Sequence, residues 1–233
     1  MIAGLTTKLQ SELTKINSSV NLLTSKDTTM KVNFDDWAFA ETDGKNIDVC
    51  RFVDSEQMHL QLVDREIIAG QITTTDLTKI ALITDSWLSK NQPIGQLKEK
   101  HDDFHVAKKY SDLLTLTVGE VLENRWTSEY ERIIKRETLF DADLFLALKN
   151  NLGNLYPFFS HDNLSFSNIL EVPNDNFKSP IIFCNNGIFE IGLTLDNSPS
   201  NNSFKTTDIG IAVDKTIELL PTDYEMTRNP ITN

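Results

Sequence analysis

Two histidines four positions apart form the only grouping of metal-ligating side chains that the sequence suggests. The segment His101-Asp102-Asp103-Phe104-His105 would place both imidazoles on one face of a helix, with two carboxylates beside them. No glutamate stands in the second position of an H-E-x-x-H motif, however, and no cysteine or third histidine is near. We therefore predict a solvated loop or helix end and no metal site, with a metal held by His101 and His105 as the alternative.

The residues Ser160, His161 and Asp162 are the three residue types of a serine hydrolase, placed side by side. A catalytic triad needs side chains that converge from separated positions, so three consecutive residues do not form one. The sequence also has no G-x-S-x-G motif, which carries the nucleophile in a large class of hydrolases. We predict a turn in which Asp162 or Ser160 satisfies backbone groups.

Close pairs of carboxylates are frequent in the middle of the chain: Glu120 and Glu123, Glu129 and Glu131, and Asp141 and Asp143. A glycosidase or an enzyme with a carboxylate-bound metal would use such a pair. On helices, this density of carboxylates is typical of a solvated face, and we predict solvated faces for all three pairs.

Basic residues form a stripe in the same segment: Arg125, Arg132, Lys135 and Arg136. Because Glu129 and Glu131 lie among them, local salt bridges explain the stripe more simply than an anion site does. The chain has only nine glycines and neither a G-x-x-x-x-G-K-[ST] nor a G-x-G-x-x-G loop. We predict that it is not an enzyme and has no catalytic, cofactor-binding or metal-binding residues.

The composition is strongly acidic, with 34 acidic and 22 basic residues and a formal charge of −12. Nucleic acid and anionic membranes attract proteins through lysine and arginine, so this balance argues against both as partners. It favours a basic protein partner, whose association would be electrostatically steered. A well-solvated surface that maintains solubility is the alternative explanation.

Cysteine use and the N-terminal residues both indicate a reducing compartment. Cys50 and Cys184 each lie in an apolar, strand-like run, and we expect buried free thiols. The segment Met1–Leu5 has neither the basic nor the apolar region of a signal peptide. No apolar run approaches the length of a membrane span. We predict a cytoplasmic protein.

The first ninety residues predict a helix, an antiparallel meander and a second helix. Apolar residues recur at three- and four-residue steps over 2–24, which indicates an amphipathic helix. Closely linked strand-like runs follow at 31–40, 47–53, 59–63 and 66–72. A helix over 76–89 carries Trp87 on its apolar face.

The middle of the chain predicts helices. Pro93 suits the first turn of a short helix to Lys100, and 106–114 is another short helix. The range 117–138 predicts a long helix with Trp126 on its apolar face. Asp141 caps a further helix that ends at Gly153.

The C-terminal part again predicts strands followed by a helix. A strand is expected at 163–169, and a hairpin over 180–195 turns at Asn185-Asn186-Gly187, which suits a type I′ turn. A polar, mobile loop at 196–203 precedes a helix over 208–220. The tail from Thr222 has no periodicity, and we expect it to be loosely held.

Two helices begin in nearly the same way, at Thr74-Thr75-Asp76 and at Thr206-Thr207-Asp208. Threonine and aspartate oxygens accept the unpaired N–H groups of a helix's first turn, so both motifs are predicted to be structural caps. We predict an α+β fold with two antiparallel sheet-plus-helix units, 1–92 and 155–233, and a helical connector at 93–154. One continuous sheet through both units is the alternative.

The segment Leu60–Leu88 (LQLVDREIIAGQITTTDLTKIALITDSWL) has a strand-turn-strand-helix order that ends in Trp-Leu. Two further segments follow it along the chain, Leu155–Ser167 (LYPFFSHDNLSFS) and Glu218-Leu219-Leu220-Pro221. With these segments in this order, roughly 50–221 resembles a bacterial, largely actinobacterial, domain family of unknown function whose members are sometimes labelled natural-product biosynthesis proteins. The resemblance transfers no catalytic residue.

These observations predict an acidic, cytoplasmic protein whose function is to bind another protein. The most concrete form is an immunity protein that neutralises a bacterial toxin, with a basic toxin domain as partner and neither nucleic acid nor membrane bound. A secretion chaperone or adaptor and an accessory protein of natural-product biosynthesis are the alternatives.

Overall fold

The computed structural model describes residues 4–23, 34–160, 162–167, 179–195, 198–199 and 203–220. The chain divides into two compact units, Met1–Thr115 and Leu116–Asn233. The dividing point lies inside the range predicted as a helical connector. The predicted loose tail from Thr222 and His161 lie outside the described residues, as does most of the polar loop predicted at 196–203.

An antiparallel meander forms the sheet of the first unit, as the sequence predicted. Its strands follow one another in the order of the chain: β1 (Phe34–Thr42), β2 (Lys45–Phe52), β3 (Met58–Asp64), β4 (Ile67–Thr74) and the two-residue β5 (His105–Val106). Two-residue turns join β1 to β2 and β3 to β4, and a longer connection joins β2 to β3. Asp43 and Gly44 take positive φ values of 50° and 80° between β1 and β2.

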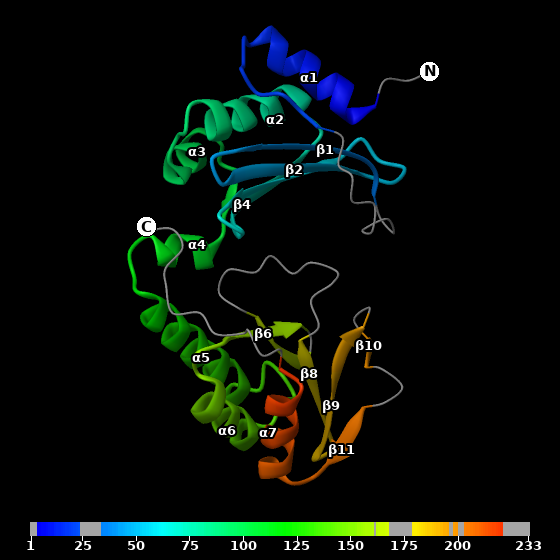
Figure 1. Cartoon of the computed structure of the whole chain (residues 1–233), viewed down its shortest axis with the longest axis vertical. Coiled ribbons are helices and arrows are strands. Elements are labelled where there is room, and N and C mark those ends of the chain that lie inside the picture. Colours follow the sequence, from blue (N-terminus) through cyan, green and yellow to red (C-terminus); the bar gives the residue numbers. More distant parts are fainter. Residues whose placement is uncertain are drawn as a thin grey trace. The chain divides into compact units, whose positions relative to one another are not determined.

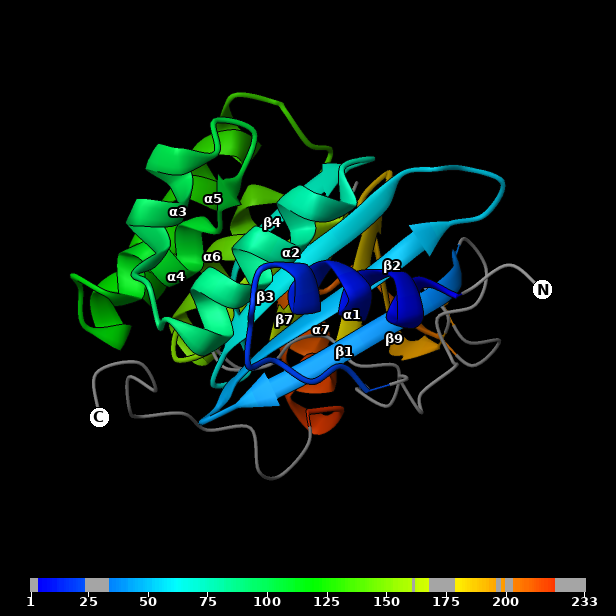
Figure 2. The same cartoon turned by 90° about the horizontal axis from the view of Figure 1, so that it is seen from above.

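One face of this sheet is apolar and lies under helices (Figures 1 and 2). The neighbouring residues Val49, Leu60 and Ile72 of β2, β3 and β4 are each at most 1% exposed. The helices α1 (Leu5–Lys15) and α2 (Leu77–Thr84) pack against each other above this face. Alternate strand residues therefore form the core of the first unit.

The first helix is shorter than the predicted range 2–24. Asn17 takes a positive φ of 54°, and the N–H groups of Asn17 and Ser18 donate to the carbonyls of Thr14 and Leu13. This is a Schellman ending, and it stops the helix while the apolar spacing continues. Leu23 instead forms a bridge with Phe39 of β1, so the end of the predicted helix is extended chain.

The helical segment after β4 changes from an α-helix to a π-helix before it ends. α2 continues into a π-helical turn, η1 (Asp85–Ser89), which buries Trp87 to 1% exposure. The short helices α3 (Ile94–Lys100) and α4 (Lys108–Leu113) complete the first unit. Pro93 precedes α3 as its N-cap residue.

The second unit has its own antiparallel sheet. Its strands are β6 (Tyr156–Ser160), β7 (Asn163–Ser167), β8 (Pro180–Asn185), β9 (Ile188–Leu195), β10 (Ser198–Pro199) and β11 (Phe204–Thr206). The order is β10-β9-β8-β7-β6, and β11 also pairs with β9. Asn186 and Gly187 have φ values of 51° and 76°, as the predicted type I′ hairpin requires. Among the described residues no strand of one sheet pairs with the other, which confirms two separate sheets.

Three helices cover the second sheet: α5 (Val118–Ile134), α6 (Ala142–Leu152) and α7 (Ile209–Glu218). Trp126 is fully buried, and its ring centroid lies 4.9 Å from that of Phe145 on α6. α5 ends before the predicted Thr138, because Arg136 takes a positive φ of 59°. Gly153 follows α6 with φ −61°, so it does not end the helix through the left-handed conformation that we expected of a glycine.

α5 also contacts the backbone of β6, the strand at one end of the sheet order. The indole Nε1 of Trp126 donates to the carbonyl of Leu155 at 3.0 Å. The Nε of Arg125 donates to the carbonyl of Pro157 at 3.1 Å. Side chains of α5 thus donate to two carbonyls that no strand of the described chain pairs.

The two Thr-Thr-Asp motifs have the same local structure. The Oδ1 of Asp76 accepts from the N–H of Lys79 at 3.0 Å, and the Oδ1 of Asp208 accepts from Ile211 at 2.9 Å. Each aspartate N–H in turn donates to the threonine hydroxyl two residues before it. Both motifs are helix caps, as predicted.

Loss of either cap should destabilise the protein without altering partner binding. We expect Asp76→Ala and Asp208→Ala each to lower the free energy of unfolding by about 0.5–2 kcal/mol, because one N–H of the first turn loses its acceptor. Urea titrations of each variant measure this. Asp76→Asn retains an acceptor oxygen and is the matched control. An alanine variant that kept the parent's stability but lost binding would make that aspartate a contact residue.

Candidate functional site

The two histidines of the predicted metal grouping do not share a helix. His101 follows α3 with extended backbone, and His105 begins β5, where it pairs with Gln71. Phe104 between them is fully buried, and Asp103 pairs with Lys79 at 2.6 Å. Burial and the Lys79 ammonium hold the pKa of His101 below its usual range. No group of three metal-ligating side chains is present in the described ranges.

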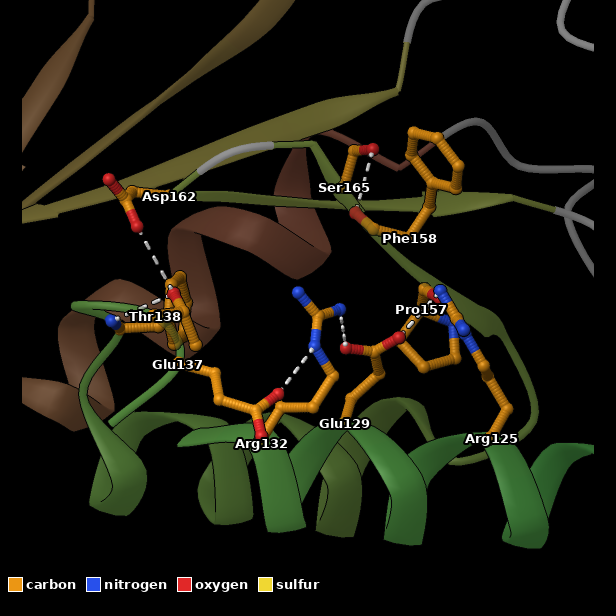
Figure 3. A network of polar contacts seen from close by, with 10 residues as sticks. Arg125, Glu129, Arg132, Glu137, Thr138, Pro157, Phe158, Asp162 and Ser165 are labelled. Atoms are coloured by element: carbon orange, nitrogen blue, oxygen red, sulfur yellow. Dashed lines mark hydrogen bonds and ion pairs between the residues drawn. The ribbon is translucent and has the colours of Figure 1, made fainter. Parts of the chain in front are cut away.

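Asp162 holds the chain that follows α5 (Figure 3). Its Oδ1 accepts from the N–H of Leu139 at 3.3 Å and from the hydroxyl of Thr138 at 3.4 Å. Acceptance of a backbone N–H confirms the structural role predicted for this residue. Ser160 is the last residue of β6.

Several of the paired carboxylates cap a helix or form an ion pair between helices. Glu120 forms a capping box with Thr117 at the start of α5, and Asp141 caps α6. Glu123 pairs with Lys149 across α5 and α6 at 2.6 Å. Glu120, Glu123 and Asp143 are all exposed, so the predicted solvated face is confirmed for these three residues.

Glu129 is the exception, because its side chain is fully buried. Its Oε2 lies 2.7 Å from Nη1 of Arg132, and its Oε1 lies 2.6 Å from Nη2 of Arg125 (Figure 3). The Arg125 contact is an ion pair whose atoms are not aligned for a hydrogen bond. The prediction of a solvated face is wrong here, because two arginines turn back over the carboxylate.

The sequence contains a signal for this burial. The buried residues of α5 include Val118, Leu122, Trp126 and Ile133, and Glu129 falls on the same stripe at helical spacing. A carboxylate on an apolar stripe, flanked by arginines three and four positions away, indicates a buried ion cluster. Here the cluster orients Arg125 toward the carbonyl of Pro157.

A polar hollow of about 540 Å³ opens in the first unit beside the β1–β2 turn. Lys45 and Asn91 line it, and the Nζ of Lys45 donates to Oδ1 of Asn91 at 2.5 Å. The same Nζ lies 3.8 Å from the ring centroid of Trp87. Asp64 also lines the hollow, and it accepts from the Tyr110 hydroxyl at 2.8 Å. The charged groups Lys45 and Asp64 are thus occupied by neighbouring side chains.

The pKa shifts in and near this hollow follow from burial. Burial lowers the pKa of the Lys45 ammonium, and the Asp64 carboxylate partly opposes this. Burial and the hydrogen bond to Asp64 raise the pKa of Tyr110 above its usual range. The Lys45 contact with Trp87 attaches η1 to the sheet, and the hydrogen bond from Tyr110 to Asp64 attaches α4 to it.

Both thiols are protonated at neutral pH. Burial raises the pKa of Cys50 to about 12 and that of Cys184 to about 11. Since the thiolate is the nucleophile, neither residue is activated for chemistry. Both are free, as expected; Cys50 is buried, whereas Cys184 is partly exposed.

Asp48 is the one strongly shifted carboxylate of the described chain. It lies on the sheet face opposite α1 and α2, between Phe39 of β1 and Gln61 of β3. Its Oδ1 is buried without a hydrogen-bond partner, and burial raises its pKa to about 6. Ionisation of Asp48 therefore makes the free energy of unfolding depend on pH.

Comparison with protein-family models, with curated proteins and with solved structures gives no match. None of the helices in the described part of the chain is long and apolar enough to cross a membrane.

Removal of the Glu129 charge should destabilise the second unit. We expect Glu129→Gln to lower the free energy of unfolding by about 1–3 kcal/mol, because charge-assisted contacts to two arginines are lost. The matched control is Glu131→Gln on the same helix, whose exposed carboxylate lies 3.5 Å from Lys135. That change should cost less than about 0.5 kcal/mol. Equal effects of the two variants in urea titrations would contradict a special role for Glu129.

Replacement of Asp48 should stabilise the protein at neutral pH. Its folded pKa of about 6 exceeds the unfolded value of about 3.9, so ionisation favours the unfolded chain as pH rises between these values. Asp48→Asn should therefore gain about 1–3 kcal/mol of stability at pH 7 and almost nothing at pH 4.

Asp54→Asn is the control for this change, because Asp54 is exposed in a turn with a φ of 55° that asparagine also tolerates. Urea titrations at both pH values measure the difference. A gain from Asp48→Asn that is the same at pH 4 and pH 7 would show that burial of the charge is not its cause.

Proposed function

We propose that this chain is a cytoplasmic protein that binds a basic protein partner, in the manner of an immunity protein that neutralises a toxin. The observation that carries the proposal is the distribution of charge. Leu116–Asn233 has 17 acidic and 9 basic residues, a formal −8, whereas Met1–Thr115 has 17 and 13, a formal −4. The sequence of the second unit therefore carries twice the formal negative charge of the first.

Part of this acidity is not used inside the fold. Glu123, Glu129 and Asp141 have internal roles as ion-pair partners or caps. Asp143 and Asp214 are exposed, and neither has an ion-pair partner among the described residues. Such carboxylates remain available to lysine and arginine of another protein.

A toxin that acts on nucleic acid needs a basic surface, because the phosphates must be neutralised. An acidic protein of complementary charge associates with such a surface rapidly and in a fixed orientation. Charge complementarity to such a toxin favours an immunity role over a general binding role.

A secretion chaperone or adaptor is the second candidate. The α-β-meander-α order of the first unit, from α1 to α2, suits a small domain that presents a surface to a client segment. The partner decides between the two roles, since an immunity protein binds one folded toxin domain and a chaperone binds an extended segment. An accessory role in natural-product biosynthesis would instead be shown by turnover of a metabolite.

The direct test is co-expression with the protein encoded by the neighbouring gene. We expect a stable complex that restores growth of cells expressing that protein and that contains its folded domain. Absence of a complex, together with undiminished toxicity, would refute the immunity role. A complex with only an extended segment would move the assignment to a chaperone.

Salt should weaken the complex mainly by slowing association. Between about 0.02 M and about 0.15 M salt we expect the association rate constant to fall roughly tenfold, because long-range attraction is screened. The dissociation rate constant should change little. Stopped-flow fluorescence with the purified partner measures both, and an unchanged association rate would contradict steering.

A further inference from the structure

The two units carry similar helix pairs, and their outer surfaces differ. In each unit one helix packs beside the helix that a Thr-Thr-Asp motif begins, α1 with α2 and α6 with α7. Both pairs use their inner residues to cover a sheet. The outer residues are not part of that core, so core packing does not determine whether they are polar or apolar.

The outer side of α6 and α7 combines exposed apolar and acidic residues. We call the following set the α6–α7 surface: Asp143, Leu146, Ile211, Asp214, Ile217 and Glu218. Leu146 is 37% exposed, Ile211 50% and Ile217 42%. The α7 members fall within about one third of the helix circumference, opposite the buried Ala212 and Thr216. The helices lie side by side in Figure 1.

The outer side of α1 and α2 provides an internal comparison. Its exposed residues include Lys8, Ser11 and Lys15, and Leu82 is the only large apolar residue of α1 and α2 that is similarly exposed, at 41%. The outer side of α1 and α2 is therefore mostly polar, with one exposed apolar residue. The outer side of α6 and α7 has three, which are Leu146, Ile211 and Ile217.

We propose that the α6–α7 surface is the docking site for an amphipathic helix of the basic partner. Apolar side chains of that helix would cover Leu146, Ile211 and Ile217, while its lysines or arginines would face Asp143 and Asp214. The inference rests on the proposed function, which it makes specific to a surface and to a kind of partner.

Burial of apolar side chains and attraction between opposite charges would both favour docking at this surface. Exposed isoleucines on an outer helix face have no role in the core of this unit, and their burial by a partner is favourable. Apolar residues ringed by charged ones are typical of an interface with a dry centre and a polar rim. Glu218 pairs with Lys215 at 2.8 Å, so Asp143 and Asp214 are the carboxylates left for the partner.

A defined probe tests the surface without knowledge of the partner. A fluorescent peptide of about 18 residues, with leucine and lysine at amphipathic helical spacing, is titrated with the full chain, and a leucine–glutamate peptide of the same pattern is the control. We expect the lysine peptide to bind at least about tenfold more tightly than the glutamate peptide.

Variants then locate the binding. Ile211→Lys should weaken binding of the lysine peptide about tenfold, and Ile217→Gln should weaken it without a change of charge. Leu82→Lys adds the same charge at a similarly exposed position of α2, and should leave the affinity within about twofold. Thermal unfolding of each variant confirms that the fold is kept. Equal weakening by Ile211→Lys and Leu82→Lys would overturn the proposal, because the binding would then be a general charge effect.

Two further outcomes separate the docking surface from the proposed function. If the neighbouring gene's protein binds Ile211→Lys as tightly as the parent, the surface is wrong while the binding function stands. If no such partner binds but the lysine peptide still requires Ile211, the surface stands while the immunity role fails. Sedimentation that shows a dimer lost in Ile211→Lys would overturn the proposal, since a second copy would then occupy the surface.

Discussion

An antiparallel sheet with one apolar face is stable only while other elements cover that face, and this constraint governs both units. In the first unit the apolar face includes Val49, Leu60 and Ile72, and α1 and α2 cover it. In the second unit Leu164, Ile182 and Ile191 form one cluster with buried residues of α5, α6 and α7. The caps, turns and helix ends all serve to place helices over these faces.

The sequence predicted those parts of the fold that local chemistry determines. The alternating runs of β2 to β4, the Asn186-Gly187 turn and the caps at Asp76 and Asp208 all follow from short-range preferences, and the structure contains them. The end of α1 could not be read in the same way, because apolar spacing continues past Asn17 and a single left-handed residue stops the helix. Burial of Glu129 likewise depends on how two arginines fold back over it, although its position on the apolar stripe indicated it.

The polar groups of this molecule divide into those that the fold uses and those that it leaves available. Lys45, Asp64 and Glu129 have partners within their own unit, so they contribute to structure. Asp143 and Asp214 stand on a helix layer whose inner side already completes the core. The α6–α7 surface could not be predicted from the sequence. It depends on the packing of α6 beside α7, and about sixty residues separate these helices in the chain.

The contact between α5 and β6 has a consequence for how the second sheet can interact. A strand at the end of a sheet usually offers free backbone groups to which another extended chain can add, and this is a common route to aggregation. Trp126 and Arg125 already occupy the carbonyls of Leu155 and Pro157, and Pro157 itself has no N–H to donate. Lengthening of the sheet by an incoming strand is therefore blocked along this part of β6. A protein that bound there would have to use side-chain contacts, because these two carbonyls already have donors within the unit.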